Sequence, residues 1–314
     1  MGDQADELRR LVAARRRLLH DAPGKRKSLR ASIVAIASGK GGVGKSNIAL
    51  NLALSLARRD LRVVLVDADF GAANICILGG INAPYTLHDV VMGKRELEEV
   101  LVEGPFGLKI VPGATGMAEL ADLDDFRRKK LVRDFRTLER RADLVLVDAG
   151  AGISKNVTDI LTGADQVLMV TVPESIAIAN AYSLIKSLVL SGDSPKLRLV
   201  INRAKNEIEA ADVLSNMSLV ARKFLKYELE CLGWIPADVH LPRAVRERVP
   251  VTVKYPYSPF SRGIKQILPA FISGLDMVME EPGGKGLFGF LRQLYRGVAG
   301  VVGKYRHGSQ LQAN

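Results

Sequence analysis

Short runs of apolar residues alternate along the chain with longer segments whose apolar residues recur at helical spacing. Short apolar runs bounded by turn residues are typical of buried strands, and the longer segments are typical of amphipathic helices. The expected strands are residues 32–38, 62–67, 108–111, 144–148, 166–172, 197–202 and 232–235. The expected helices include residues 46–58, 124–140, 175–190, 210–230 and 258–279. This alternation predicts an α/β fold: a doubly wound, mostly parallel sheet with helices on both faces.

The two ends of the chain follow a different pattern. Residues 3–19 would place an apolar stripe that includes Leu8 and Leu11 on one side of a helix. Residues 20–31 form a basic linker with a turn at Pro23 and Gly24, and we expect none of it to pack. A second break at residues 282–284 precedes another apolar stripe. We therefore expect an N-terminal segment (1–31), a body (32–279) and a C-terminal tail (280–314).

Composition limits the class of protein. The chain has 314 residues, of which 47% are hydrophobic, so it can bury a large core. Cys76 and Cys231 stand far apart, which indicates neither a disulfide framework nor a zinc or iron–sulfur site. We expect no signal peptide and no membrane span, because no apolar run reaches about 20 residues.

The net charge of +11 is concentrated at the ends. Residues 1–31 hold nine Lys or Arg and four Asp or Glu, and residues 283–314 hold five and none. Of the 45 basic and 34 acidic residues, 31 and 30 therefore remain for the body. A nearly neutral body with two basic ends favours anionic partners for the ends, although solvated tails would show the same charge.

Residues 39–46 have the features of a phosphate-binding loop. Such a loop needs glycines whose N–H groups turn inward, a lysine for the outer phosphates and a hydroxyl for Mg2+. An expected strand precedes this segment and an expected helix follows it, which disfavours a simple glycine-rich turn. The segment reads Gly39, Lys40, Gly41, Gly42, Val43, Gly44, Lys45 and Ser46.

Carboxylates stand at the ends of two expected strands. Asp67 and Asp69 follow one apolar run on the same side of the chain, and Asp148 follows another. Strand ends in such a sheet meet at the ligand-binding edge. A nucleoside triphosphatase needs one carboxylate near Mg2+, which Asp148 fits, and one to orient water, which Asp69 fits. Acidic strand ends that only aid solubility are the alternative.

Together these residues resemble the MinD/ParA-type ATPases, whose deviant Walker A motif carries a second lysine like Lys40. In that family the equivalent lysine reaches across an ATP-bound dimer to the phosphates of the partner. The resemblance implies a P-loop NTPase fold of the SIMIBI type, ATP and Mg2+ as cofactors, and a homodimer held together by ATP.

The same resemblance assigns roles to individual residues. It implies catalytic roles for Lys40, Lys45 and Asp69, and a Mg2+ site at Ser46, Asp67 and Asp148. Asn202 matches the asparagine that reads adenine. The implied ATP-binding residues are Gly39, Lys40, Gly41, Gly42, Val43, Gly44, Lys45, Ser46, Asn47, Asn202, Arg203 and Pro236.

Residues 44–47, 67–74, 150–153 and 181–186 resemble one branch of the family, the flagellar number regulators of the FlhG (FleN, YlxH) type. Ala149 and Cys76 depart from the usual pattern of the branch. The N-terminus resembles the short motif with which this branch stimulates the signal-recognition-type GTPase FlhF. The residues of that motif are Asp3, Gln4, Ala5, Leu8 and Arg9. A helix folded back on its own domain is the alternative.

The C-terminal tail has the composition of a helix that lies in an anionic membrane interface. Its apolar side carries Leu287, Phe288, Phe290, Leu291, Leu294, Tyr295 and Val298. Five basic residues and no acidic residue accompany this side. A helix docked on the body is the alternative. One tail should bind weakly, whereas the two tails of a dimer would bind with avidity.

We therefore expect a slow regulatory ATPase that cycles between a cytoplasmic monomer and a dimer on the inner face of the cytoplasmic membrane. A flagellar switch protein or a transcription regulator is a candidate second partner. One rival is a MinD-type division-site protein, which has no reason to carry the N-terminal motif. Another is a ParA-type partition protein, but the nearly neutral body leads us to expect no direct specific binding to nucleic acid.

Overall fold

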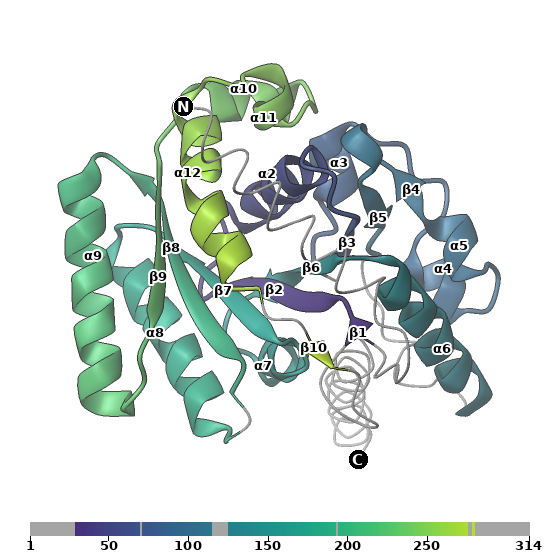
Figure 1. Cartoon of the computed structure of the whole chain (residues 1–314), viewed down its shortest axis with the longest axis horizontal. Coiled ribbons are helices and arrows are strands. Elements are labelled where there is room, and N and C mark those ends of the chain that lie inside the picture. Colours follow the sequence, from purple (N-terminus) through teal and green to yellow (C-terminus); the bar gives the residue numbers. More distant parts are fainter. Residues whose placement is uncertain (1–28, 70, 115–124, 193, 276–277, 280–314) are drawn as a thin grey trace, which may run out of the picture.

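The structure is a computed structural model, and it describes residues 29–69, 71–114, 125–192, 194–275 and 278–279. An eight-stranded sheet forms its centre, in the order β4-β5-β3-β6-β2-β7-β8-β9 (Figure 1). Its strands are parallel except for the antiparallel pair β4–β5. The strands are β2 (Ser32–Ser38), β3 (Val63–Ala68), β4 (Val102–Glu103), β5 (Lys109–Val111), β6 (Leu144–Ala151), β7 (Gln166–Thr171), β8 (Lys196–Ala204) and β9 (Glu230–Pro236). The predicted fold class is confirmed.

Helices cover both faces of the sheet, and a hydrophobic cluster fills the space on each side. One face carries α2 (Lys45–Ala57), α3 (Ile75–Gly79), α10 (His240–Arg246), α11 (Val251–Lys254) and α12 (Pro259–Ser273). The other carries α4 (Leu87–Val91), α5 (Leu97–Val100), α6 (Asp125–Arg141), α7 (Lys155–Thr162), α8 (Ser175–Leu190) and α9 (Glu207–Val220). Successive residues of β2, such as Ile33 and Val34, enter different clusters, because side chains alternate along a strand.

The helix expected over residues 210–230 ends earlier than predicted. Helix α9 stops at Val220, and a π-helical turn, η3 (Ala221–Leu225), follows it. Lys226 then adopts a left-handed conformation with φ 55°, which ends the helical geometry. The hydroxyl of Tyr227 accepts a 2.9 Å hydrogen bond from the Leu197 N–H of β8, so the chain turns back toward the sheet. Residue 230 consequently begins β9 rather than ending a helix.

The helix expected over residues 258–279 also ends early, at Ser273. The buried guanidinium of Arg198 donates to the carbonyls of Ala270 and Phe271 at the end of α12. A Cβ at Gly274 would lie 2.4 Å from that guanidinium, so another residue there would displace Arg198. The chain leaves the helix at this point and forms β10 (Val278–Met279).

The expectation that residues 20–31 do not pack was wrong for their last part. Strand β1 (Leu29–Arg30) pairs with β10, so the two ends of the described body lie side by side. Arg30 is buried, and its two terminal nitrogens lie 2.7 and 2.6 Å from the carboxylate oxygens of Asp165. Its guanidinium also lies 3.3 Å from Glu139 of α6. The division of the chain into end segments and body stays a prediction.

Candidate nucleotide site

The loop between β2 and α2 has the backbone conformation that a phosphate-binding loop requires. Gly42 and Gly44 have φ angles of 82° and 93°, a region that favours glycine. A Cβ at Gly39 would lie 2.3 Å from the backbone of Asn180 in α8, so that position also requires glycine. A Cβ at Gly41 or Gly42 would meet nothing within 4 Å, so this side of the loop is open.

Lys45 brings three of the predicted site groups together. Its side chain is buried, and its Nζ lies 2.7 Å from Oδ1 of Asp148. The same nitrogen lies 3.4 Å from Oδ2 of Asp69 and 3.4 Å from Oγ of Ser46. These residues come from α2, from β6 and from the segment after β3. The sheet therefore assembles the predicted lysine, hydroxyl and carboxylates at one edge.

Asp67 and Asp148 lie opposite each other on neighbouring strands β3 and β6. Burial raises the pKa of Asp148, and Lys45 and Ser46 partly offset this effect. Its Oδ2 atom is buried and has no hydrogen-bond partner within the described residues. Burial also raises the pKa of Asp67 to about 7, although this carboxylate accepts hydrogen bonds from the N–H groups of Ile75 and Asp69.

The groups present fit ATP with Mg2+. The glycine loop and the start of α2 supply inward N–H groups for phosphate, and Lys45 supplies a positive charge. The hydroxyl of Ser46 and the unpartnered Oδ2 of Asp148 are oxygen donors of the kind that Mg2+ prefers. Asp67 already accepts two backbone hydrogen bonds, so it borders this set rather than opening into it.

Asn202 contacts the phosphate loop itself, which the sequence did not reveal. Its Nδ2 donates a 2.7 Å hydrogen bond to the carbonyl of Val43, and a Cβ at Gly44 would lie 2.5 Å from that nitrogen. Its Oδ1 is buried without a partner in the described part of the chain. Arg203 follows with φ 59°, and Pro236 pairs with Ala204 at the end of β9. The adenine-binding roles of Asn202, Arg203 and Pro236 stay predictions, as does that of Asn47.

Lys40 is held apart from the Lys45 cluster. Its Nζ lies 3.0 Å from Oε2 of Glu174, which directly precedes α8, and the two side chains are 42% and 57% exposed. An ion pair this exposed contributes little free energy, so the lysine is free to exchange partners. The sequence carried no signal for Glu174 as the partner of this lysine.

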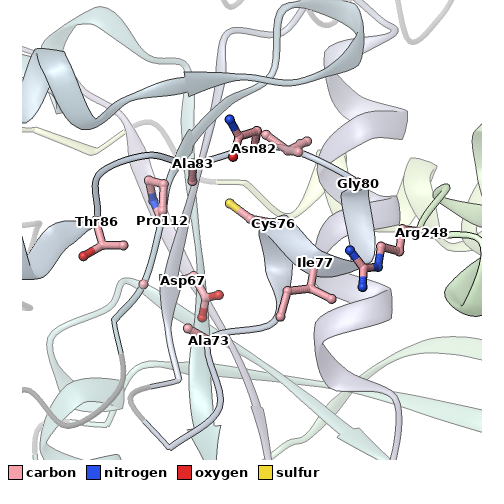
Figure 2. Close-up of a pocket in the computed structure, with 12 residues that line it drawn as sticks. Asp67, Ala73, Cys76, Ile77, Gly80, Asn82, Ala83, Thr86, Pro112 and Arg248 are labelled. Carbon is pink, nitrogen blue, oxygen red and sulfur yellow. The ribbon is translucent and has the colours of Figure 1, made fainter.

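A pocket of about 440 Å3 adjoins the site at Asp67 and is also lined by Cys76 (Figure 2). Thr86 and Arg248 also line it. Burial, with a smaller contribution from the charge of Asp67, raises the pKa of the Cys76 thiol to about 11. The thiol therefore stays protonated at neutral pH. A residue that departs from the sequence pattern of the FlhG branch thus lies beside a predicted metal-site carboxylate.

Two groups of predicted residues lie outside the described part of the chain. They are the N-terminal partner motif (Asp3, Gln4, Ala5, Leu8 and Arg9) and the C-terminal apolar stripe (Leu287, Phe288, Phe290, Leu291, Leu294, Tyr295 and Val298). None of the described helices is long and apolar enough to cross a membrane.

The chain is similar to known proteins over most of its length. A family model described as the CobQ/CobB/MinD/ParA nucleotide-binding domain matches residues 34–251. The antiactivator FleN of Pseudomonas aeruginosa is 36% identical over 235 residues, which cover 75% of this chain and 84% of that protein. The flagellum site-determining protein YlxH of Helicobacter pylori is 33% identical over 264 residues, which cover 84% and 89%. The solved structure of the MinD cell division protein of Aquifex aeolicus has a TM-score of 0.63 and 26% identity, and the match covers 80% of this chain and 100% of that one.

Proposed function

Because the chain belongs to the CobQ/CobB/MinD/ParA family, in its FlhG branch of ATPases, we propose that it regulates the number or placement of flagella. The protein is an ATPase, and we infer that hydrolysis times its release from an ATP-dependent homodimer. The flagellar part of the proposal rests on the similarity to FleN and YlxH. The observation that supports the ATP-dependent dimer is the pair of lysines in one loop. Lys45 is buried against Asp148, whereas Lys40 is exposed beside Glu174.

In the proposed reaction, each of the described site residues has its own role in ATP hydrolysis. Bound ATP and Mg2+ supply the reacting phosphoryl group and a counter-charge. The glycine loop and Lys45 would hold and orient the phosphates, while Ser46 and Asp148 would hold the metal. Asp69, at the edge of the cluster, orients the attacking water. Asn202 keeps the loop in position through its hydrogen bond to Val43.

The position of Lys40 supports the proposed dimer. An exposed lysine at the open side of the loop can leave Glu174 and reach the phosphates bound by a second subunit. A positive charge supplied in this way stabilises transition-state charge, as an arginine finger does. Hydrolysis removes the phosphate that the lysine contacts, so the dimer separates.

The ends of the chain give this cycle its partners. We infer that the tail from residue 280 onward binds the anionic inner face of the cytoplasmic membrane, and that paired tails of the dimer bind more firmly than one. We further infer that Asp3, Gln4, Ala5, Leu8 and Arg9 stimulate an FlhF-type GTPase. A second candidate function, positioning of the division site, is favoured by the 26% identity to a MinD structure.

The experiment that separates these functions measures GTP hydrolysis by the cognate FlhF-type GTPase. The full chain should stimulate hydrolysis, and Gln4→Ala should remove the stimulation because a short motif has few side chains to replace the lost contact. Gln312→Ala, at the other end of the chain, is the matched control. Equal rates with and without the wild-type chain would sink the flagellar proposal and favour the MinD-type function, while the ATPase assignment would stand.

A further inference from the structure

A second cavity of about 500 Å3 lies at the edge of the sheet that is opposite to the phosphate loop. It lies where α2 ends and β3 and β5 begin, between the turn η1 (Pro105–Gly107) and the end of α6. These elements lie toward the β4–β5 end of the sheet (Figure 1). The walls are apolar: Leu61, Val63, Leu138 and Ala142 are buried, and Leu101 is partly buried. None of these residues takes part in the nucleotide site.

Charged side chains also line the cavity. Arg62, Lys109 and Arg141 line it, against Asp60 and Glu98. Arg62 is paired with the buried Asp143, and Lys109 is paired with Glu103. Arg141 is exposed, and no ion pair to it exists within the described residues. One guanidinium at the mouth is therefore available for an acidic group.

The turn η1 places an aromatic ring at the same mouth. Phe106 has φ 63°, a left-handed conformation that is costly for an aromatic residue, and the residue is 45% exposed. The guanidinium of Arg58 lies 4.8 Å from the ring centroid. Backbone strain that surrounding structure maintains tends to occur at binding sites. Here the strain keeps an aromatic face beside an apolar cavity instead of burying it.

We propose that this cavity binds a single-chain amphiphile with an acidic head group. The apolar chain would occupy the space between Leu101, Phe106 and Leu138, and the head group would pair with Arg141 at the mouth. The volume lies in the range of small-molecule sites, and apolar walls with a few polar groups are typical of them. A free phosphate or nucleotide would leave the walls exposed to water, and an uncharged chain would leave Arg141 without a partner.

The test uses the full chain and monomeric dodecanoate, below its micelle concentration, in isothermal titration calorimetry. Arg141→Gln should weaken binding about tenfold, as expected for the loss of one charged contact. The neighbouring Arg140→Gln, which does not line the cavity, should bind as wild type. Leu101→Trp should abolish binding by filling the cavity. Dodecanol should bind more weakly than dodecanoate and should not respond to Arg141→Gln. Unchanged ATPase rates show that the variants are folded.

Two outcomes would overturn the proposal. Equal binding of dodecanoate by wild type and by Leu101→Trp would place the ligand elsewhere, for example on the C-terminal tail. If dodecanoate does not bind to wild type, the proposal is wrong, and an apolar side chain of a protein partner becomes the better candidate for the cavity. Sedimentation with phosphatidylglycerol vesicles then identifies the source of a ligand that does bind. Weaker sedimentation of Leu101→Trp would indicate a chain supplied by the bilayer, and unchanged sedimentation would indicate a free amphiphile.

Discussion

Asp69 lies at the edge of the Lys45 cluster, 3.4 Å from its Nζ, whereas Asp148 lies at 2.7 Å. The side chain of Asp69 is 18% exposed and that of Asp148 is fully buried. A carboxylate with access to water can orient a water molecule, and a fully buried one cannot easily do so. The two aspartates therefore have separable roles, which single substitutions can test.

We expect Asp69→Ala to bind ATP with little change and to lose hydrolysis by about 100-fold or more, the usual scale for a group that orients a reactant. The variant should persist as a dimer and remain on the membrane, because the hydrolysis that separates the subunits is lost. Single-turnover hydrolysis and nucleotide titration measure the two properties. Asp212→Ala, at an exposed position of α9, is the control. Normal turnover in Asp69→Ala would refute the assigned role.

Asp67 makes stability depend on pH. Its folded pKa of about 7 lies above the ordinary value, so the folded state keeps a proton that the unfolded chain releases. The stability it contributes is complete below about pH 4 and is lost as pH rises toward 7. Without nucleotide or metal, raising the pH from 4 to 8 should destabilise wild type by up to about 4 kcal/mol relative to Asp67→Asn, which does not titrate. The amide of the variant cannot accept both backbone hydrogen bonds, so the two proteins are compared by the change with pH in urea unfolding. A difference that stays constant with pH would contradict the buried, protonated carboxyl.

At the scale of elements, Arg198 of β8 holds the end of α12. It is fully buried, donates to the carbonyls of Ala270 and Phe271, and lies 2.7 Å from Oε1 of Glu230. Lys196 of the same strand pairs with the other oxygen of Glu230, at 3.1 Å, but its side chain is 40% exposed. The two cations share one acid and differ in burial, so they form a matched pair.

Arg198→Met should lower the free energy of unfolding by about 3 kcal/mol or more, because it leaves the carbonyl of Phe271 and a carboxylate oxygen of Glu230 without their donor. Lys196→Met should cost less than about 1 kcal/mol, as an exposed pair does. Urea unfolding of both variants at one pH makes the comparison. Equal losses would mean that Arg198 acts only through Glu230 and does not secure α12.

The order of helices and strands was predictable from the sequence, because the spacing of apolar residues in each long segment fits either a helix or a strand but not both. The ends of α9 and α12 were not predictable. They depend on Lys226 in a left-handed conformation and on the fit of Gly274 against Arg198, contacts between residues far apart in the chain. Residues with a defined chemical role, such as Lys45 and Asp148, could be predicted from their spacing. Supporting contacts, such as Glu174 with Lys40, depend on the fold and have no local signal.

At the scale of the whole molecule, the proposed dimer depends on Lys40 leaving Glu174. Lys40→Ala should still bind ATP, because the Lys45 cluster is intact, but it should stay monomeric when ATP is added. Light scattering coupled to gel filtration measures this, with hydrolysis blocked by Asp69→Ala in both chains. Glu174→Ala is the control and should dimerise at least as well as its parent. A Lys40→Ala dimer would show that another surface joins the subunits.

The pairing of β1 with β10 brings the first and last strands of the described body together, so a force on either end acts at the same place. Both ends of the chain pass through the same two-residue ladder, and Arg30 fixes that ladder to Asp165 and Glu139. A load applied to the C-terminal tail would therefore reach the sheet through β1 as well as through α12.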